Sequence, residues 1–197
     1  MATENTDMSE EELYGPDRLI VFPTDTLYGL GGNGFSEKVV NKIYRIKRRS
    51  REKPLALHLF DKAEIKKYTA ELTERQERLI DELLPGPYTL ILPAGPDAPS
   101  CSVSGERKVG IRVPDSETFK GLSDKFNYPL VGTSVNKSGQ PPITDFEEIV
   151  DRYGGLVDLF IESKDNIKNE PSTVLDLSYD PPKVLRGEYP RNQNKTD

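Results

Sequence analysis

The sequence predicts one α/β domain built on a mixed, twisted sheet with helices packed around it. Short apolar runs typical of buried strands alternate with helical periodicity in the first half of the chain, and strands accumulate in the second half. We find no internal repeat, domain linker or low-complexity segment among the 197 residues. We therefore expect a single domain over residues 16–188, with a flexible segment before it (1–15) and a flexible tail after it (189–197).

The composition is typical of a water-soluble globular protein. The net charge is -6, with 35% hydrophobic and 30% charged residues, so a broad surface that tracks phosphates is not expected. No apolar run approaches the ~20 residues of a membrane span, and the acidic N-terminus does not resemble a signal peptide. The single cysteine and single histidine exclude an internal disulfide and a metal site rich in either residue. We expect a cytoplasmic protein without a membrane partner.

The first half of the chain carries clear signals for where its elements begin. Residues 19–22 are wholly apolar, as expected of a strand buried on both faces. Ser36 is a good N-cap, and Thr73 with Gln76 matches a capping box, so each should begin a helix. In order, we expect a helical turn at 8–13, strands at 19–22, 55–60 and 88–92, and helices at 36–48, 62–68 and 73–84, with a polar and then glycine-rich loop at 23–34.

The second half contains more strands and more irregular chain. Residues 95–105 are rich in Pro, Gly and Ser and should form a mobile loop. Ser116 should cap one helix, and Thr144 with Glu147 should form the capping box of another. In order, we expect strands at 109–113, 130–133, 156–162, 173–177 and 184–185, with helices at 116–126 and 144–153.

A cluster of cations interrupts the acidic chain at residues 45–53, where six of nine residues are Lys or Arg. It leads directly into an apolar strand that carries His58. Such a cluster in an acidic protein indicates a local anion site. The alternative is a solvated helix end whose cations complement the helix dipole, with His58 as an ordinary core residue.

Polar side chains follow two predicted strands, at the edge where α/β sheets bind ligands. They are Thr24, Asp25, Thr26 and Tyr28 after the first strand, and Ser134, Asn136 and Ser138 after the strand at 130–133. Local turns and caps explain such residues equally well. Arg112 lies inside a strand, where a cation requires either an acidic partner or a ligand.

The glycines at 29, 31 and 34 match the dinucleotide-binding fingerprint in spacing but not in context. That fingerprint needs its first glycine directly after a strand and an acidic residue about 20 positions later. Here Pro23 to Tyr28 intervene, and the basic cluster occupies the later position. The P-loop pattern is absent as well, so any nucleotide must be held by side chains and turns.

Taken in order, eight motifs resemble those of the YrdC-like family of threonylcarbamoyl-AMP synthases. They are PTDTLYGL at 23–30, IYRIKRR at 43–49, KPL with His58 at 53–58, LPGPYT at 84–89, VGIRVP at 109–114, SVNKSG at 134–139, PST at 171–173 and LRG at 185–187. The resemblance spans residues 19–187 and implies the concave YrdC-like fold with a central ligand-binding hollow, in its minimal single-domain form. Two positions depart from the pattern. Val135 stands where the family usually has alanine, and Lys108 stands where it often has threonine.

The resemblance implies an L-threonylcarbamoyladenylate synthase, which is a nucleotidyltransferase. Such an enzyme joins L-threonine, bicarbonate and ATP, with Mg²⁺ on the phosphates, and releases pyrophosphate. A downstream transferase then moves the threonylcarbamoyl group to tRNA. Because an anion attacks an anion, neutralising cations would supply most of the catalysis, without a covalent intermediate.

The resemblance also assigns site residues. Lys47 and Arg49 are expected to be catalytic, and the residues expected to hold the triphosphate or adenylate are Lys47, Arg49, Lys53, Ser134, Asn136, Thr144 and Arg186. The residues expected to hold threonine are Thr26, His58, Arg112 and Ser172, with Arg112 suited to pair with the carboxylate in a bidentate manner. The remaining cations of the cluster, Arg45, Arg48 and Arg51, would then face solvent.

Two other functions stay open at this point. An RNA-binding module for tRNA or double-stranded RNA would use the basic cluster directly, but the acidic net charge and the lack of interleaved aromatic residues disfavour it. A carbamoyl-transfer domain acting on carbamoyl phosphate is disfavoured because we expect no accessory acylphosphatase or zinc-finger part.

Overall fold

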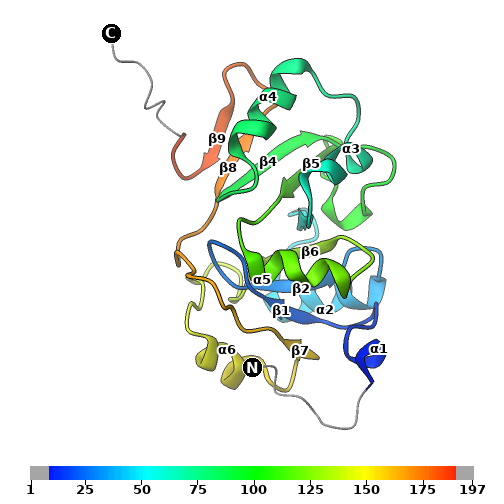
Figure 1. Ribbon diagram of the computed structural model, residues 1–197, viewed down its shortest axis with the longest axis vertical. Coiled ribbons are helices and arrows are strands. Elements are labelled where there is room, and N and C mark those ends of the chain that lie inside the picture. The colour runs from blue at the N-terminus through cyan, green and yellow to red at the C-terminus, as the bar shows by residue number, and fades with distance from the viewer. Residues whose placement is uncertain (1–8, 190–197) are drawn as a thin grey trace.

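Nine strands form one mixed sheet in the computed structural model, which describes residues 9–189 (Figure 1). The strands are β1 (Ile20–Phe22), β2 (Gly29–Asn33), β3 (Ala56–His58), β4 (Tyr88–Pro93), β5 (Lys108–Arg112), β6 (Leu130–Ser134), β7 (Leu159–Phe160), β8 (Thr173–Asp176) and β9 (Lys183–Arg186). Their order is β7-β1-β2-β6-β3-β5-β4-β8-β9, with parallel pairs at β1–β7, β3–β5 and β4–β8 and antiparallel pairs elsewhere. The predicted mixed α/β sheet is confirmed.

The described residues form six α-helices, of which those after Ser36, Thr73 and Ser116 begin where their capping signals predict. They are α1 (Glu10–Leu13), α2 (Glu37–Lys47), α3 (Ile65–Tyr68), α4 (Glu74–Leu83), α5 (Glu117–Lys120) and α6 (Phe146–Tyr153), with 3-10 turns η1 (Lys62–Glu64), η2 (Ser100–Ser102) and η3 (Gly121–Asp124). The Ser36 hydroxyl caps α2 by accepting from the Val39 amide, and Thr73 with Gln76 forms the expected capping box of α4. No helix among residues 9–189 is long and apolar enough to cross a membrane.

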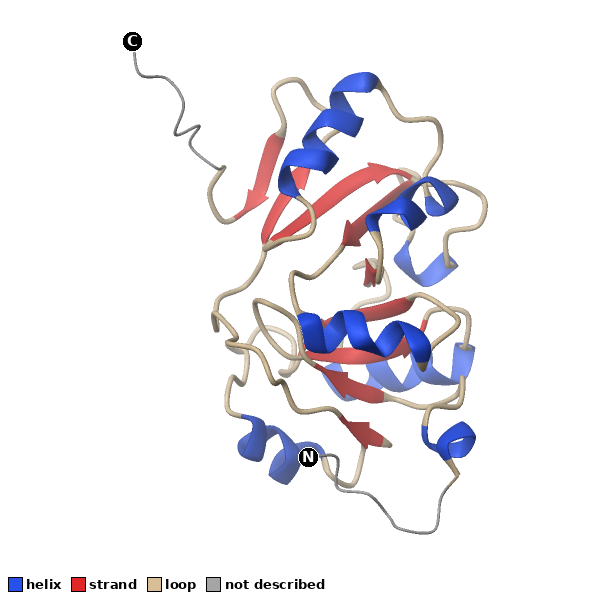
Figure 2. Cartoon of the chain, viewed as in Figure 1, coloured by secondary structure: helices blue, strands red, loops and turns tan. Residues whose placement is uncertain are grey.

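The strand β1 is buried on both faces, as its apolar sequence predicts. Ile20 and Phe22 pack in one core cluster with Phe119 of α5, whereas Val21 packs in the other with Val39 of α2. Figures 1 and 2 accordingly show α5 and α2 on opposite sides of the same strands. The sheet therefore has helices on both faces in this half of the molecule.

The sheet divides into two halves around β3. Figure 1 shows β1, β2, β6 and β7 in one half and β4, β5, β8 and β9 in the other, with α3 and α4 beside the second. The strand β3 pairs with β6 on one side and with β5 on the other, so it joins the halves. Segments from both halves line the cavity described below.

Three expectations about local structure are wrong. The glycine-rich residues after Tyr28 form the strand β2, not a loop, because backbone pairing with β1 and β6 needs no side chains. The helix α6 is capped by Asp145, which accepts from the Glu148 amide at 2.8 Å, so the Thr144–Glu147 capping box does not form. The predicted strand at 156–162 shortens to β7 because Leu156 and Val157 close the last turn of α6.

The ends of the chain were expected to be flexible. Residues 1–8 and 190–197 lie outside the described residues. Within the remainder of the N-terminal segment, Glu10–Leu13 forms the predicted helical turn α1. Leu13 and Tyr14 pack against the cluster that contains Phe22, and the Tyr128 hydroxyl donates to the Tyr14 carbonyl.

The centre of the sheet leaves no room for a side chain at Gly31. This residue lies in β2 between β1 and β6, and a Cβ built there would overlap the carbonyl oxygen of Val131 on the neighbouring strand. It would also lie 2.9 Å from the Phe22 ring. The close approach of these backbones therefore requires glycine.

We predict that Gly31→Ala lowers the free energy of unfolding by at least about 3 kcal/mol, because backbone and ring must both shift to admit the methyl group. Urea unfolding measures this change. Gly121→Ala is the matched control, since Gly121 has a helical backbone and its added Cβ would meet no atom within 4 Å. Equal stability of the two variants would contradict the packing argument.

Candidate functional site

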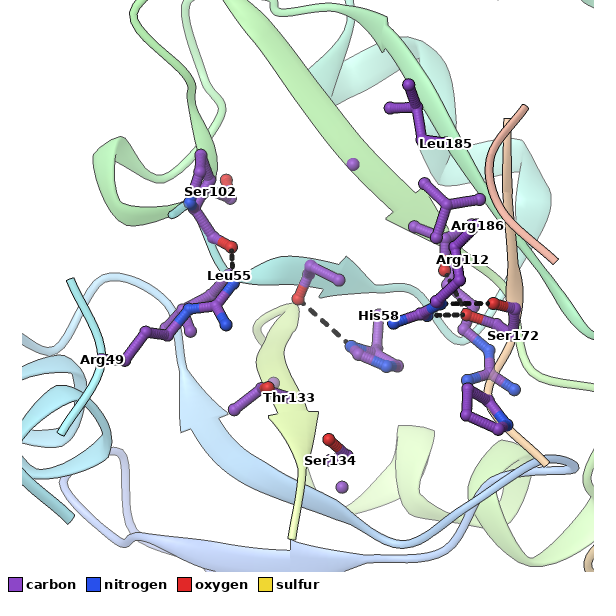
Figure 3. Close-up of a pocket in the computed structure, with 18 of the residues that line it drawn as sticks. Arg49, Leu55, His58, Ser102, Arg112, Thr133, Ser134, Ser172, Leu185 and Arg186 are labelled. Atoms are coloured by element: carbon purple, nitrogen blue, oxygen red, sulfur yellow. Dashed lines mark hydrogen bonds between the residues drawn. The ribbon is translucent and has the colours of Figure 1, made fainter. Parts of the chain in front are cut away.

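A cavity of about 830 Å³ lies between the two halves of the sheet (Figure 3). Its walls come from the turn after β1, the end of α2, the strands β2, β3, β4, β5, β6, β8 and β9, the loop after β6, and the segment at 102–106 before β5. Figure 3 shows Arg49 on one side of it and Arg112, Arg186 and Ser172 on the other. This size suits a small-molecule ligand.

Most of the predicted site residues meet in this cavity. Those that line it are Thr26, Lys47, Arg49, His58, Arg112, Ser134, Asn136, Ser172 and Arg186. Lys53 does not line it, and the side chain of this residue is exposed. Thr144 lines a separate cavity beside α6, which shares Asn136, Gln140 and Pro142 with the first. The structure thus does not bring Lys53 and Thr144 together with the others.

The basic cluster divides between cavity and solvent. Lys47 is buried and Arg49 is half-buried, and both line the cavity. Arg45, Arg48 and Arg51 are exposed, as expected. The left-handed turn at Arg48 (φ 51°, ψ 43°) ends α2 and separates the last helical residue, Lys47, from Arg49.

The ammonium of Lys47 joins the end of α2 to the loop after β6. It donates to the Ser134 carbonyl at 2.5 Å, the Asn136 carbonyl at 2.9 Å and Asn136 Oδ1 at 2.6 Å. The Lys47 carbonyl in turn accepts from the Ser138 amide at 2.9 Å. An ammonium has three N–H donors, so all of them have protein acceptors here. A direct phosphate contact from Lys47 stays a prediction, because it requires the exchange of one of these bonds.

Arg49 and Arg186 are held by uncharged oxygens. Arg49 donates to the carbonyls of Lys53 and Pro54, each at 3.0 Å. Arg186 donates to the Ser172 carbonyl and to the Ser172 hydroxyl, each at 2.9 Å. These bonds orient both guanidinium groups while leaving their charge unbalanced, which is what an anion site requires.

The cations of the cavity repel one another. Burial, and then the charge of Arg49, lower the pKa of Lys47 to about 8. Burial, and then the same charge, lower the pKa of Arg186. Burial likewise lowers the pKa of Arg112, to which Arg186 adds a smaller effect. A bound polyanion would relieve this repulsion.

His58 is a neutral, buried hydrogen-bonding group. Its Nδ1 lies 3.2 Å from the Ala56 carbonyl, and a carbonyl can only accept, so Nδ1 carries the proton. Burial, and then the charge of Arg112, lower its pKa to about 3. The imidazole packs edge-on against Phe22, with ring centroids 5.2 Å apart. Nε2 therefore carries a lone pair, and His58 can accept a hydrogen bond from a ligand in the cavity.

Arg112 has the acidic partner that its position in a strand led us to consider. The guanidinium Nη2 donates to Asp25 Oδ1, and the two side chains are 7% and 6% exposed. The turn that carries Asp25 is held by Thr24, whose hydroxyl accepts from the Thr26 and Leu27 amides. The polar residues after β1 therefore form a turn and also supply three cavity residues, Thr24, Thr26 and Tyr28.

Several cavity residues were not predicted. Lys108 lies at the rim, 3.0 Å from both Glu106 and Asp176, and these hydrogen bonds raise its pKa. Thr89 shares a hydrogen bond of 2.9 Å with Ser172. No local pattern predicts the contact of Lys108 with Asp176, because the two residues are far apart along the chain and meet only when β5, β4 and β8 are neighbours.

The fold and the residues that line the cavity together define a class of protein. It is an α/β protein with a concave mixed sheet and a cavity lined by three arginines, a neutral histidine and hydroxyl groups, which is suited to an anionic small molecule. Among residues 9–189, no three Asp, Glu, His or Cys side chains are grouped so that they could hold a metal ion. A metal that accompanies a phosphorylated ligand would therefore need the phosphates as its main ligands.

The chain belongs to the YrdC/Sua5 family. The family model for Sua5, YciO and YrdC proteins, described as "Telomere recombination", matches residues 13–187. The predicted resemblance is confirmed, and it covers both halves of the sheet.

Curated relatives are named as threonylcarbamoyl-AMP synthases. A protein of Pyrococcus abyssi is 32% identical over 169 residues, which are 86% of this chain and 50% of that protein. A Methanocaldococcus jannaschii protein, named as a putative threonylcarbamoyl-AMP synthase, is 37% identical over 83% of this chain and 76% of its own length. The Bacillus subtilis protein is 34% identical over 86% of this chain and 49% of its own length. The chain thus spans about half the length of two of these relatives.

Solved structures share the fold. The P. abyssi Sua5 structure in complex with L-threonine aligns with a TM-score of 0.80 and 30% identity, over 91% of this chain and 54% of that one. Escherichia coli YciO aligns with a TM-score of 0.79 and 28% identity, over 91% and 90% of the two chains. The concave YrdC-like fold is therefore confirmed.

The buried histidine predicts a pH dependence of stability. The pKa of His58 is about 3 in the folded protein, compared with 6.5 for an exposed histidine. Between these two pH values the unfolded chain therefore binds more protons than the folded one. Stability is therefore present above pH 6.5 and is lost as the pH falls. We expect His58 to account for about 2 kcal/mol of the loss between pH 7 and pH 5. Urea unfolding at both values measures it, and His58→Gln should lack this component.

The Lys47 contacts predict a local effect of substitution. Lys47→Met removes the donor for two carbonyls and one amide oxygen, so the loop after β6 loses its anchor. We expect amide hydrogen exchange in residues 134–140 to become about tenfold faster or more. Lys42→Met is the control, because Lys42 is ion-paired to Asp158 away from the cavity. Unchanged exchange in Lys47→Met would refute the anchoring role.

Proposed function

We propose that this chain is an L-threonylcarbamoyladenylate synthase, and hence a nucleotidyltransferase that uses L-threonine, bicarbonate and ATP and releases pyrophosphate. The observation that carries the proposal is the convergence of Arg49, Arg112 and Arg186 on one cavity with a neutral histidine between them. The names of the relatives and the threonine bound to P. abyssi Sua5 support the choice of substrates.

The cavity divides between the two substrates. Arg49 and Arg186, whose charges have no counter-charge in their hydrogen bonds, would take the phosphates. Arg112, His58, Thr26 and the Ser172 hydroxyl would take threonine, with the carboxylate on the guanidinium. Ser134 and Asn136 would contact the nucleotide from the loop that Lys47 holds. Lys53 and Thr144 would join the nucleotide site only after movement of their segments.

The chemistry requires position and charge more than a reactive side chain. A carbamate formed on the threonine amine attacks the α-phosphate of ATP, and pyrophosphate leaves. The arginines neutralise the negative charge that gathers where these two anions meet. Mg²⁺ would neutralise further charge when it is bound to the phosphates. The neutral Nε2 of His58 can accept a hydrogen bond from threonine without adding a charge.

The product implies its consumer. A threonylcarbamoyl adenylate is an activated acyl donor, so a downstream transferase that modifies tRNA is the partner that we propose, in the cytoplasm where ATP and tRNA are found. Direct RNA binding as the sole function is less well supported. Lys47 and Arg49 face a small cavity rather than an outer surface. The cations of the cluster that are open to a macromolecule are Arg45, Arg48, Arg51 and Lys53.

We predict that the purified protein with Mg²⁺ releases pyrophosphate from ATP only when both L-threonine and bicarbonate are present, and that threonylcarbamoyl-AMP accumulates. Arg49→Ala should lower kcat/KM at least about 100-fold, because a cation at the phosphates is lost. Mass spectrometry of the product and a pyrophosphate assay measure both effects. Arg45→Ala, a change at an exposed cation of the same cluster, should retain wild-type activity. Pyrophosphate release that ignores threonine would refute the proposal.

A further inference from the structure

Behind the cavity wall, Arg112 is paired with a carboxylate that does not line the cavity. Asp25 is buried, with 5% of its surface exposed, and its Oδ1 accepts from Arg112 Nη2. Arg112 lines the cavity and Asp25 does not. The guanidinium thus lies between Asp25 and any ligand. A buried carboxylate at this distance cancels most of the charge that the guanidinium presents.

The pair is fixed from both sides. Thr24 holds the turn on which Asp25 lies, and the Asp25 carbonyl accepts from the Lys168 amide at 3.1 Å. Arg112 belongs to β5, which pairs with β3 and β4. The ion pair is therefore part of the rigid frame and not a contact between mobile side chains.

The other two arginines of the cavity have a different surrounding. The hydrogen bonds of Arg49 and Arg186 go to carbonyl and hydroxyl oxygens, which carry no net charge. Within the described part of the chain, the ion pairs of the structure assign a carboxylate to Arg112 and none to Arg49 or Arg186. The cavity thus has two cationic positions with full charge and one with its charge largely balanced.

This asymmetry discriminates between anions. Coulomb energy scales with the product of charges, so the negative charge of Asp25 repels a phosphate chain several times more than a single carboxylate at the same distance. A carboxylate still gains hydrogen bonds from the guanidinium N–H groups that the contact with Asp25 Oδ1 does not use. The N–H donors of Arg112 can therefore bind either anion, but the largely balanced charge of the Arg112–Asp25 pair favours a carboxylate, which carries a single negative charge.

We propose that Asp25 is a specificity-determining residue, which reserves Arg112 for the carboxylate of the amino acid and directs phosphates to Arg49 and Arg186. The inference rests on the proposed function, because that function requires both kinds of anion in one cavity. In this role Asp25 acts through Arg112 and touches neither substrate.

The test is the affinity of the full chain for inorganic pyrophosphate, measured by calorimetry. Asp25→Asn keeps the shape of the side chain and removes its charge, so this variant should bind pyrophosphate at least about tenfold more tightly than the wild type. In the presence of pyrophosphate, its affinity for L-threonine should fall, since phosphate now competes for Arg112. Asp25→Glu should keep the wild-type affinity for pyrophosphate. Asp158→Asn, which alters an ion pair with Lys42 outside the cavity, should also leave it unchanged.

A second comparison does not depend on the folding of Asp25→Asn alone. The single variant Arg112→Gln leaves the negative charge of Asp25 without a counter-charge. The double variant Asp25→Asn/Arg112→Gln replaces the whole ion pair by two neutral amides. The double variant should therefore bind pyrophosphate at least about tenfold more tightly than Arg112→Gln. Equal affinities in either comparison would overturn the inference. Failure of the proposed function would give a different result: the wild-type protein would release pyrophosphate from ATP whether or not threonine is present.

Discussion

The buried ammonium of Lys47 is the contact on which the arrangement of the cavity depends. It lies at the last residue of α2 and fastens three oxygen atoms of the loop that follows β6. These two segments are far apart in the sequence, and both supply cavity residues. Because the ammonium is buried, the loop cannot replace it with water at small cost. The position of Ser134 and Asn136 relative to Arg49 thus follows from one side chain.

The rest of the site is a balance of charge inside a hollow of modest size. The protein orients Arg49 and Arg186 through neutral oxygens and pairs Arg112 with Asp25. Like charges in the cavity repel one another, and an anionic ligand would relieve that repulsion. His58 stays neutral in the same surroundings because burial and Arg112 act on its pKa in the same direction. The three arginines of the cavity therefore differ in net charge, because only Arg112 is paired with a carboxylate among the described residues.

The sequence was sufficient for most elements, and nine of the eleven residues expected in the site lie around one cavity, while their roles stay predictions. Periodicity and caps located the helices because those signals are local. The strand β2 was missed because glycines carry no alternation of side chains, and its pairing partners come from elsewhere in the chain. The N-cap of α6 was assigned to Thr144, but Asp145, which is the stronger cap and lies one residue later, takes that position. Pairs such as Lys108 with Asp176 depend on the order of the strands, which no local pattern contains.

Two glycines of the cavity wall limit how the shape of the cavity could change. Gly29 and Gly132 line it, and a Cβ at either would lie within 2.8 Å of the Phe22 ring, which also supports His58. At these two positions the wall is bare backbone, and a side chain there would have to displace the aromatic ring beneath. A change in the size of ligand that fits would therefore be easier to make on the opposite wall, at positions of β4, β5 and β8. The two halves of the sheet thus differ in how far a substitution can alter the cavity without disturbing the core.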